Sequence, residues 1–230
     1  QNKMDIKYKI LKLKNSKIEE IKDPVSVEEP LEMRLKYKTK NEWEIQNISI
    51  TMRTPGNDED LIRGFLYNER IIENMKEIDS IEHQGDTSGD YNLQNIIEAT
   101  INKTDNLEIG KLKRNFVTNS SCGVCGKTSL DSIEIIKTNK IDLSYPKIKE
   151  EIILHSPKLL MNEQSEFAKT GGIHASGLFS SNGDLITLRE DVGRHNALDK
   201  MIGDSLINNY LQPTDQFITC SGRLNFELVQ

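Results

Sequence analysis

The chain has 230 residues and a formal net charge of −6, from 30 Lys and Arg against 36 Asp and Glu. This length corresponds to one large domain or two modest ones, and the acidic balance argues against binding of nucleic-acid strands. There is no run of about 18 apolar residues and no apolar core behind the charged start, so we expect no membrane span and no secretory signal. Three cysteines do not make a secreted disulfide scaffold, which favours a cytoplasmic protein.

The first hundred residues predict strands around one helix. Apolar and polar residues alternate as in half-buried strands near 4–10, 31–37, 43–52, 78–84 and 91–101. The alternation changes phase between Ile45 and Ile48, which predicts a bulge or a strand that crosses to a second face. Pro55 and Gly56 end that strand, and Asn57 is the expected N-cap of the helix that follows.

The second half predicts a larger domain of mixed helices and strands. The expected elements are a strand at 116–117, helices at about 129–138, 148–162 and 196–211, a hairpin within 171–190, and a strand at 216–220. Asn182-Gly183, between the hairpin strands, is the strongest short-range turn signal. We therefore divide the chain into domains 1–112 and 113–230, and we expect the second to be truncated because the sequence stops inside an apolar helical pattern.

The sharpest chemical feature is Ser-Cys-Gly-Val-Cys-Gly-Lys at 121–127, which places Cys122 and Cys125 three positions apart. Two such thiols can share a metal, form a disulfide or pass a sulfur atom from one to the other. Lys127 and the N-terminus of the following helix would favour the reactive thiolate. The remaining cysteine, Cys220, ends an apolar strand and is expected to be a buried structural thiol.

Zinc is the first alternative for these cysteines. Cys122, Cys125, His174 and His195 supply a Cys2His2 set in principle. However, the chain has no second CxxC and no HxxxH pair that would complete a compact finger. Zinc deaminases combine H-x-E with P-C-x-x-C, whereas here a serine replaces the proline and the segment after His174 lacks the glutamate. We expect no metal.

A second cluster of polar residues lies at 171–174 and 189–196, around the predicted hairpin. Arg194 next to a helix N-terminus favours an anion, and His195 can move a proton near neutral pH. A capped helix, with Asn196 as N-cap and an Asp191–Arg194 ion pair, explains the same residues equally well.

A third cluster is Ser221-Gly222-Arg223, between a predicted strand and a helix. Free backbone amides beside an arginine suit a phosphate group. By itself, however, the segment also fits a plain strand-to-helix turn.

These segments together resemble the formate dehydrogenase accessory sulfurtransferase family, the FdhD proteins. The residues that carry the resemblance lie between 54 and 230, in the blocks TPGNDEDLIRGFLYNERII, NSSCGVCGKTSL, TGGIHASGLFSSNGDLITLREDVGRHNALDKMIG and SGRLNFELVQ. The resemblance implies an α/β fold in which a small α+β roll domain precedes a larger, cytidine-deaminase-like, three-layer domain, in a cytoplasmic homodimer without a membrane partner.

The resemblance also implies a function, namely that of a sulfurtransferase that carries persulfide sulfur. Cys122 and Cys125 would receive sulfur from a cysteine desulfurase and pass it to the molybdenum cofactor, in its bis-guanine-dinucleotide form, for formate dehydrogenase. The cofactor is cargo, with none permanently bound and a guanine nucleotide as its mimic, and the expected contacts are His174, Arg194, His195, Ser221, Gly222 and Arg223. Two alternatives stay open: a non-catalytic molybdenum-cofactor-binding chaperone with structural cysteines, and a zinc-binding module.

Overall fold

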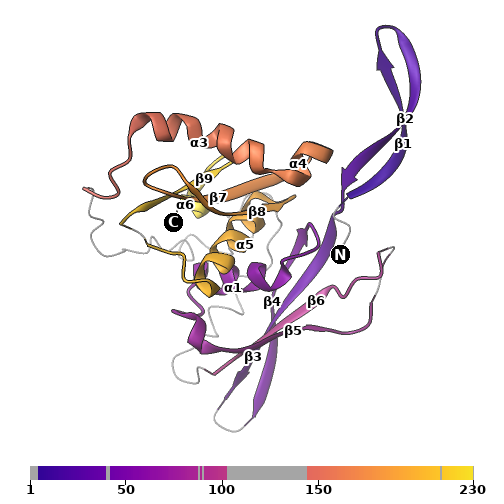
Figure 1. The fold of residues 1–230 in the computed structure, drawn as a ribbon. Coiled ribbons are helices and arrows are strands. Elements are labelled where there is room, and N and C mark those ends of the chain that lie inside the picture. Colours follow the sequence, from indigo (N-terminus) through magenta and orange to yellow (C-terminus); the bar gives the residue numbers. More distant parts are fainter. Residues whose placement is uncertain are drawn as a thin grey trace.

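The structure, a computed structural model, describes residues 5–39, 42–87, 89, 91–102, 144–212 and 214–229. Within these ranges the chain is a mixed α/β protein with a two-stranded, a four-stranded and a three-stranded sheet (Figure 1). The mixed α/β class expected from the sequence is therefore confirmed.

The first part of the chain forms an arm and a sheet. Strands β1 (Asp5–Lys14) and β2 (Lys17–Ser26) pair antiparallel in the arm, which projects away from the rest of the molecule (Figure 1). The four-stranded sheet has the order β4-β3-β6-β5, with bounds β3 (Glu29–Lys38), β4 (Trp43–Arg53), β5 (Ile78–Gln84) and β6 (Ile96–Ile101). Helix α1 (Asp58–Asn68) and the 3-10 turn η1 (Met75–Glu77) connect β4 to β5.

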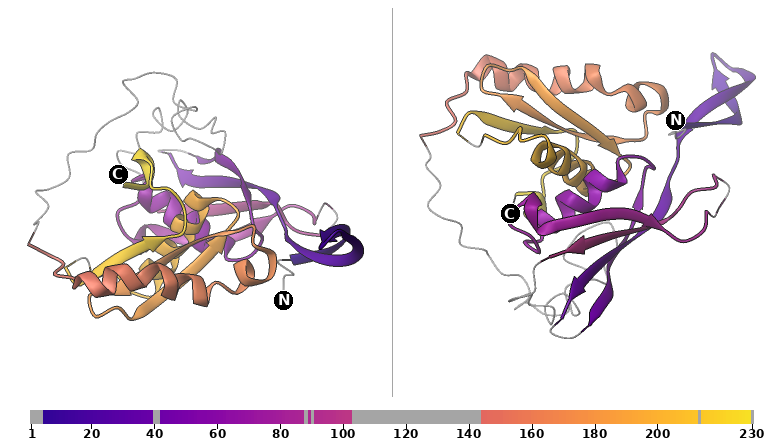
Figure 2. Two further views of the ribbon diagram at one scale, coloured as in Figure 1. Left: turned by 90° about the horizontal axis from the view of Figure 1, so that it is seen from above. Right: turned by 60° about the horizontal axis from the view of Figure 1, so that its bottom comes forward.

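The later part of the chain is layered. Its three-stranded antiparallel sheet has the order β8-β7-β9, with bounds β7 (His174–Ser180), β8 (Leu185–Asp191) and β9 (Gln216–Cys220). Helices α3 (Glu150–Glu163) and α4 (Ser165–Thr170) lie on one side of this sheet, and α5 (Arg194–Ile207) lies on the other (Figure 2). The short helix α6 (Phe226–Val229) follows β9.

Burial of apolar faces explains this stacking. Every second residue of β3 is buried, from Leu31 to Tyr37, and the apolar face of α1 covers them with Leu61, Ile62 and Leu66. The three-stranded sheet has a core on each side. On one side, Leu160 of α3 packs with Ala175 and Phe179 of β7. On the other side, Leu178 of β7 packs with Met201 and Ile202 of α5.

Helices α1 and α5 join the two parts at unusually short range. A Cβ atom on Gly64 would lie 1.8 Å from the carbonyl oxygen of Asp199, and one on Gly203 would lie 2.0 Å from that of Asp60. Only glycine permits this approach, so at each of these two positions the backbones of the helices are in direct contact. The order of layers is therefore helix, sheet, helix, helix, sheet (Figures 1 and 2).

Several predicted elements are confirmed. The pairing of β3 with β4 shifts register opposite Met33 and Arg34, so that Ile48 is the extra residue of a bulge within the region where the phase change predicted one. The hairpin of β7 and β8 turns at Gly183, which has a positive φ of 93°. Strand β9 also lies where the sequence predicts it.

Other local expectations are wrong or incomplete. Asn57 stands at the N-cap of α1 but has a left-handed backbone, and within the described structure its side chain makes no capping hydrogen bond. Strand β2 and helix α4 were not predicted. Helix α5 begins at Arg194, so Asn196 lies inside it and is not its N-cap.

Some predictions fall outside the described residues. The domain boundary near 112, the strand at 116–117 and the helix at 129–138 lie within 103–143, which the structure does not describe. The division into domains 1–112 and 113–230 and the cytidine-deaminase-like arrangement remain predictions.

One carboxylate between α1 and α5 makes stability depend on pH. Burial raises the pKa of Asp199 from 3.8 to about 8, although Asn68 Nδ2 donates a hydrogen bond to its Oδ1 at 2.7 Å. Between these values the folded state binds a proton that the unfolded chain has released, so stability falls as pH rises through this window.

Asp199→Asn mimics the protonated acid, and we expect it to increase the free energy of unfolding at pH 8 by about 1–2 kcal/mol. The gain stays this small because the side chain is partly exposed to solvent. At pH 4 the variant and the parent should agree. Urea unfolding at both pH values measures this, with Asp86→Asn in an exposed loop as the unchanged control. An equal gain at both pH values would contradict the assignment.

Candidate functional site

The predicted persulfide loop lies outside the described residues. Cys122 and Cys125 fall within 103–143, so their roles remain predictions. Among the described residues, the candidate site consists of the predicted ligand-binding residues of the later part of the chain.

The start of β7, the end of β9 and the start of α5 meet at one edge of the three-stranded sheet. The Ala175 amide donates to Ser221 Oγ at 2.9 Å, and the Ser221 amide donates to the Ala175 carbonyl oxygen at 2.9 Å. His174 Nδ1 lies 3.4 Å from Ser221 Oγ. A histidine and a serine that are 47 positions apart in sequence therefore share this edge because β7 and β9 are antiparallel neighbours.

Gly222 is the contact point between this edge and α5. A Cβ atom there would lie 3.2 Å from His174 Nδ1 and 3.3 Å from Arg194 Cβ, both tight contacts. The turn therefore brings His174, Ser221, Gly222 and Arg194 together, as the sequence clusters predict. Arg223 follows in the same turn and is exposed.

His195 lies on the neighbouring side of α5 and faces α6. Its Nε2 atom is 3.2 Å from Asn225 Nδ2 and 3.4 Å from Glu227 Oε2. The structure thus places His195 in a polar contact with α6 and not against His174 or Ser221.

A buried ion pair holds the start of α5 in place. Asp191 and Lys200 are 0% and 1% exposed, and Lys200 Nζ lies 2.7 Å from Asp191 Oδ2. Asp191 also accepts hydrogen bonds from the amides of Thr54, at 3.1 Å, and Gly193, at 2.8 Å. Lys200 donates to the Thr54 carbonyl oxygen at 2.8 Å. The Asp191–Arg194 ion pair considered from the sequence is wrong, because Lys200 is the partner of Asp191.

Asn196 completes this network across the two parts of the chain. Its Nδ2 atom donates to Asp191 Oδ1 at 3.1 Å and to the Met52 carbonyl oxygen at 2.8 Å, and Thr51 Oγ1 donates to its Oδ1 at 3.1 Å. The segment 189–196 therefore divides into buried positioning residues and the residues Arg194 and His195 at the helix start.

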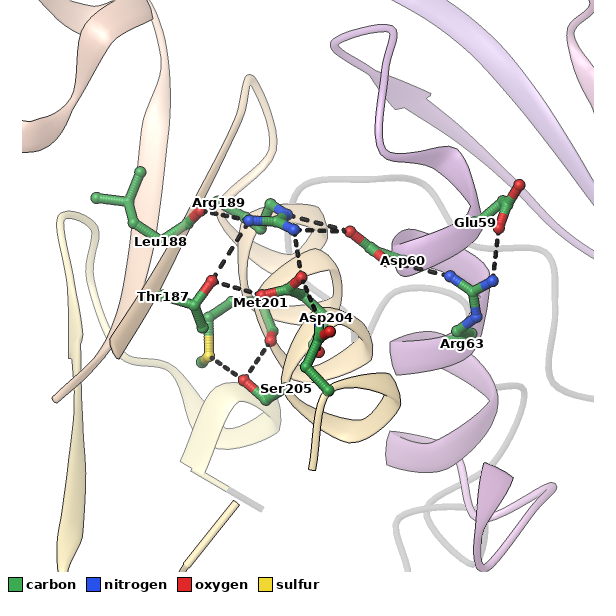
Figure 3. Close-up of polar contacts among 10 residues, drawn as sticks. Glu59, Asp60, Arg63, Thr187, Leu188, Arg189, Met201, Asp204 and Ser205 are labelled. Carbon is green, nitrogen blue, oxygen red and sulfur yellow. Dashed lines mark hydrogen bonds and ion pairs between the residues drawn. The ribbon is translucent and has the colours of Figure 1, made fainter. Parts of the chain in front are cut away.

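A second network, drawn in Figure 3, fixes the same hairpin to α1. Arg189 Nε and Nη2 both donate to Asp60 Oδ2 at 3.1 Å, and Nη2 also pairs with Asp204. Thr187 donates to Asp204, and Arg63 pairs with Asp60 from the other side. Burial raises the pKa of the Asp60 carboxyl, while Arg189 acts to lower it. These charges are satisfied internally, so this network is structural.

Cys220 differs from its prediction. It is half-buried instead of buried, and its Sγ accepts a hydrogen bond from Ser176 Oγ at 3.4 Å. Burial raises the pKa of this thiol, which disfavours the nucleophilic thiolate. Cys220 is therefore a poor candidate for sulfur chemistry.

No group of three or more His, Cys, Asp or Glu side chains among the described residues could hold a metal ion. No helix in the described part of the chain is long and apolar enough to cross a membrane.

Chemically, the edge at Gly222 suits an anionic ligand. The guanidinium of Arg194, the first turn of α5 and the exposed Arg223 all favour negative charge, and His174 and Ser221 add polar side chains next to them. Within α5, the sequence did not reveal that Lys200 supports this site. The one signal was a lysine among the apolar residues of that helix.

Comparison with known proteins defines the class of protein. The model of the FdhD/NarQ family matches residues 27–230. The chain belongs to this family, which confirms the resemblance inferred from the four sequence blocks. The arm of β1 and β2 precedes the matched region.

Individual relatives agree with this assignment. The chain is 37% identical to "Sulfur carrier protein FdhD" of Sulfurisphaera tokodaii, over 97% of this chain and 78% of that protein. It is 40% identical to the protein of the same name from Picrophilus torridus, over 91% and 74%. The same name belongs to a relative from Streptomyces avermitilis, which is 37% identical over 96% and 77%.

A solved structure supports the fold. The crystal structure of a formate dehydrogenase accessory protein from Desulfotalea psychrophila matches with a TM-score of 0.63, over 98% of this chain and 76% of that chain. The two sequences are 19% identical, so this likeness concerns the fold alone.

Proposed function

We propose that this protein is a sulfur carrier, and a sulfurtransferase, that passes persulfide sulfur from a cysteine desulfurase to the molybdenum cofactor required by formate dehydrogenase. Binding of the cofactor is supported by one observation. His174, Ser221 and Gly222 meet Arg194 at the start of α5. The names of the relatives support the role in carrying sulfur.

The chemistry assigned to the two loop cysteines balances. The Cys122 thiolate attacks the terminal sulfur of the donor persulfide, so that the donor's sulfur–sulfur bond breaks, the donor leaves as a thiolate and a Cys122 persulfide forms. Cys125 can then take over the terminal sulfur. Alternatively, it attacks the inner sulfur, in which case a Cys122–Cys125 disulfide forms and the two thiols supply the electrons that release the carried atom as sulfide.

The proposed acceptor is the bis-guanine-dinucleotide form of the cofactor, as cargo and not as a resident group. Arg194, Arg223 and the Gly222 turn would hold its phosphates, with His174 beside them. His195 contacts Asn225 and Glu227, so it would contribute indirectly, by holding α6 in position.

We also propose a cytoplasmic homodimer, as the family resemblance implies. The arm offers a surface for such a contact, because Leu11, Leu13 and Ile18 near its tip are 73%, 71% and 70% exposed. A two-stranded hairpin is only marginally stable in water without such cover. A monomer at micromolar concentration in sedimentation velocity would contradict the dimer.

Replacing Cys122 with alanine tests the sulfur carrier. After incubation with cysteine and a desulfurase, the parent should carry a sulfur adduct on the peptide that holds Cys122 and Cys125, as seen by mass spectrometry. The variant should lose the Cys122 adduct and mature formate dehydrogenase only to background. Cys220→Ala, which changes a thiol with a raised pKa, is the matched control and should retain both.

The same experiment separates the alternatives. A non-catalytic chaperone would keep dehydrogenase maturation in Cys122→Ala. A zinc-binding module would contain stoichiometric zinc in the parent by elemental analysis and lose it in the variant. Either result would overturn the proposal.

A further inference from the structure

His195, near the start of α5, has one ring nitrogen between two opposite hydrogen-bonding groups. Its Nε2 atom lies 3.2 Å from Asn225 Nδ2, which can only donate, and 3.4 Å from Glu227 Oε2, which accepts. The His195 and Glu227 side chains are 26% and 24% exposed. A ring nitrogen donates when it carries a proton and accepts when it does not, so Nε2 can bond to only one of these two groups at a time.

The side-chain amide of Asn225 is held in one orientation. Its Oδ1 atom accepts a hydrogen bond from the Leu228 amide at 3.2 Å, which directs its Nδ2 to the imidazole. A reversed amide would leave the Leu228 amide, in the single turn of α6, without this acceptor. Neutral His195 therefore accepts from Asn225 through Nε2 and carries its own proton on Nδ1.

Protonation of the imidazole reverses this preference. With a proton on Nε2, the ring opposes the donor Asn225 Nδ2 and attracts the carboxylate of Glu227. The Glu227 oxygen is already within ion-pair distance, so only the short segment from Asn225 to Glu227 has to adjust. Neutral and protonated His195 therefore hold different residues of the same segment.

This segment continues the turn that suits an anion. Gly222 and Arg223 directly precede it in the chain. On the other side, a Cβ atom on Gly222 would lie 3.3 Å from Cβ of Arg194, the neighbour of His195 on α5. The contact that His195 makes with the segment therefore acts on both sides of the turn.

Among the described residues, the charged groups around the imidazole come from three elements. Glu227 lies on α6, Arg223 in the turn, and Arg194 and Asp199 on α5. Burial is the main cause of the raised pKa of Asp199, and the negative charge of Glu227 adds to it. Proton uptake by His195 compensates the charge of Glu227, so this edge then becomes more favourable for an anion.

We propose that His195 is a positioning residue with two alternative contacts: it accepts from Asn225 when neutral, pairs with Glu227 when protonated, and in the protonated form strengthens anion binding at the Gly222 turn. This role rests on the proposed function, because the phosphates of the cargo are assigned there to the same turn. The charge of a histidine ordinarily changes between about pH 5 and 8, so both contacts are accessible near neutral pH.

NMR of the ¹⁵N-labelled full chain tests the two contacts. At pH 8 the neutral form of His195 should carry its proton on Nδ1, and the side-chain amide signals of Asn225 should shift together with the protonation of His195 between pH 8 and pH 6. The Glu227→Gln variant lacks the partner of the protonated ring, so the Asn225 contact should persist to lower pH. The signals of His155, on the exposed side of α3, should be the same in parent and variant.

Calorimetric titration with sulfate measures anion binding, because sulfate keeps the same charge between pH 6 and pH 8. We expect the parent to bind sulfate about three- to tenfold more tightly at pH 6, the effect of one added positive charge close to a divalent anion. His195→Gln stays neutral and should lose most of this difference, whereas Glu227→Gln should bind sulfate more tightly than the parent at pH 8. His155→Gln is the matched control and should keep the pH dependence of the parent.

Several results would overturn the proposal. One is a neutral His195 with its proton on Nε2, and another is a set of Asn225 amide signals that do not change with pH. Sulfate binding by the parent that is absent, or equal at both pH values, would also contradict it. So would a pH dependence that His174→Gln or Asp199→Asn removes and His195→Gln keeps. The NMR titration of the parent remains decisive if a variant fails to fold.

Failure of this role of His195 is distinguishable from failure of the proposed function. If the Cys122 adduct forms but sulfate binding does not depend on His195, the positioning role fails and the sulfur carrier stands. If the two contacts exchange with pH and control sulfate binding but no adduct forms on Cys122, the positioning role stands and the sulfur carrier fails.

Discussion

Replacing Gly203 with alanine is expected to lower the free energy of unfolding by at least about 3 kcal/mol, because the new Cβ has no space. It would lie 2.0 Å from the carbonyl oxygen of Asp60, a backbone atom of α1 that cannot rotate away. Gly64→Ala should cost as much, since its Cβ would lie 1.8 Å from the carbonyl oxygen of Asp199. In an ordinary exposed helix the same substitution stabilises by about 1 kcal/mol, so the sign of the change is diagnostic.

Urea unfolding followed by circular dichroism measures this effect. Gly172→Ala is the control, because its Cβ would meet nothing closer than the Thr170 carbonyl oxygen at 3.9 Å. The control should stay within about 0.5 kcal/mol of the parent. A Gly203→Ala protein as stable as the parent would show that α1 and α5 do not cross this closely.

Removal of the buried cation at Lys200 should be equally damaging. Lys200→Met keeps most of the side-chain volume but leaves Asp191, which is 0% exposed, without its countercharge. Breaking one half of a buried ion pair typically costs about 3–5 kcal/mol. The Thr54 carbonyl oxygen also loses its donor, so the contact between α5 and the residue that follows β4 should weaken.

A double-mutant cycle identifies the cause. Asp191→Asn together with Lys200→Met removes both charges, and we expect it to recover at least about 1 kcal/mol relative to the sum of the single variants. Lys158→Met, on the exposed side of α3, should have almost no effect. If the changes in unfolding free energy of the two single variants added up to that of the double variant, a direct Asp191–Lys200 pair would be contradicted.

Much of the fold follows from local pattern. The alternation from Leu31 to Tyr37 predicts β3 because a strand with one buried face must repeat every second residue. The bulge in β4 was visible as a phase change, and the Asn182-Gly183 pair marked the β7–β8 turn. The arm strand β2 was missed because none of its side chains is buried, so no face imposes an alternation.

The sequence indicated where the candidate site lies but not which of its residues face a ligand. The clusters around His174, Arg194 and Ser221, which the sequence singles out, meet at one edge, and their ligand contacts stay a prediction. Their division into positioning and ligand-facing residues was not predictable, since Asn196 bonds to Met52, 144 positions away.

By itself, the sequence determined the family, the faces of the main strands, the hairpin and the polar clusters at the ends of β7 and β9. These features depend on repeats and motifs of neighbouring residues, which burial of one face imposes locally. Only the tertiary structure decided that Lys200 is buried against Asp191 and that Gly64 and Gly203 let two helices touch. The physical reason is that the effect of a buried charge or of a missing Cβ depends on atoms that folding brings close, often from more than a hundred residues away.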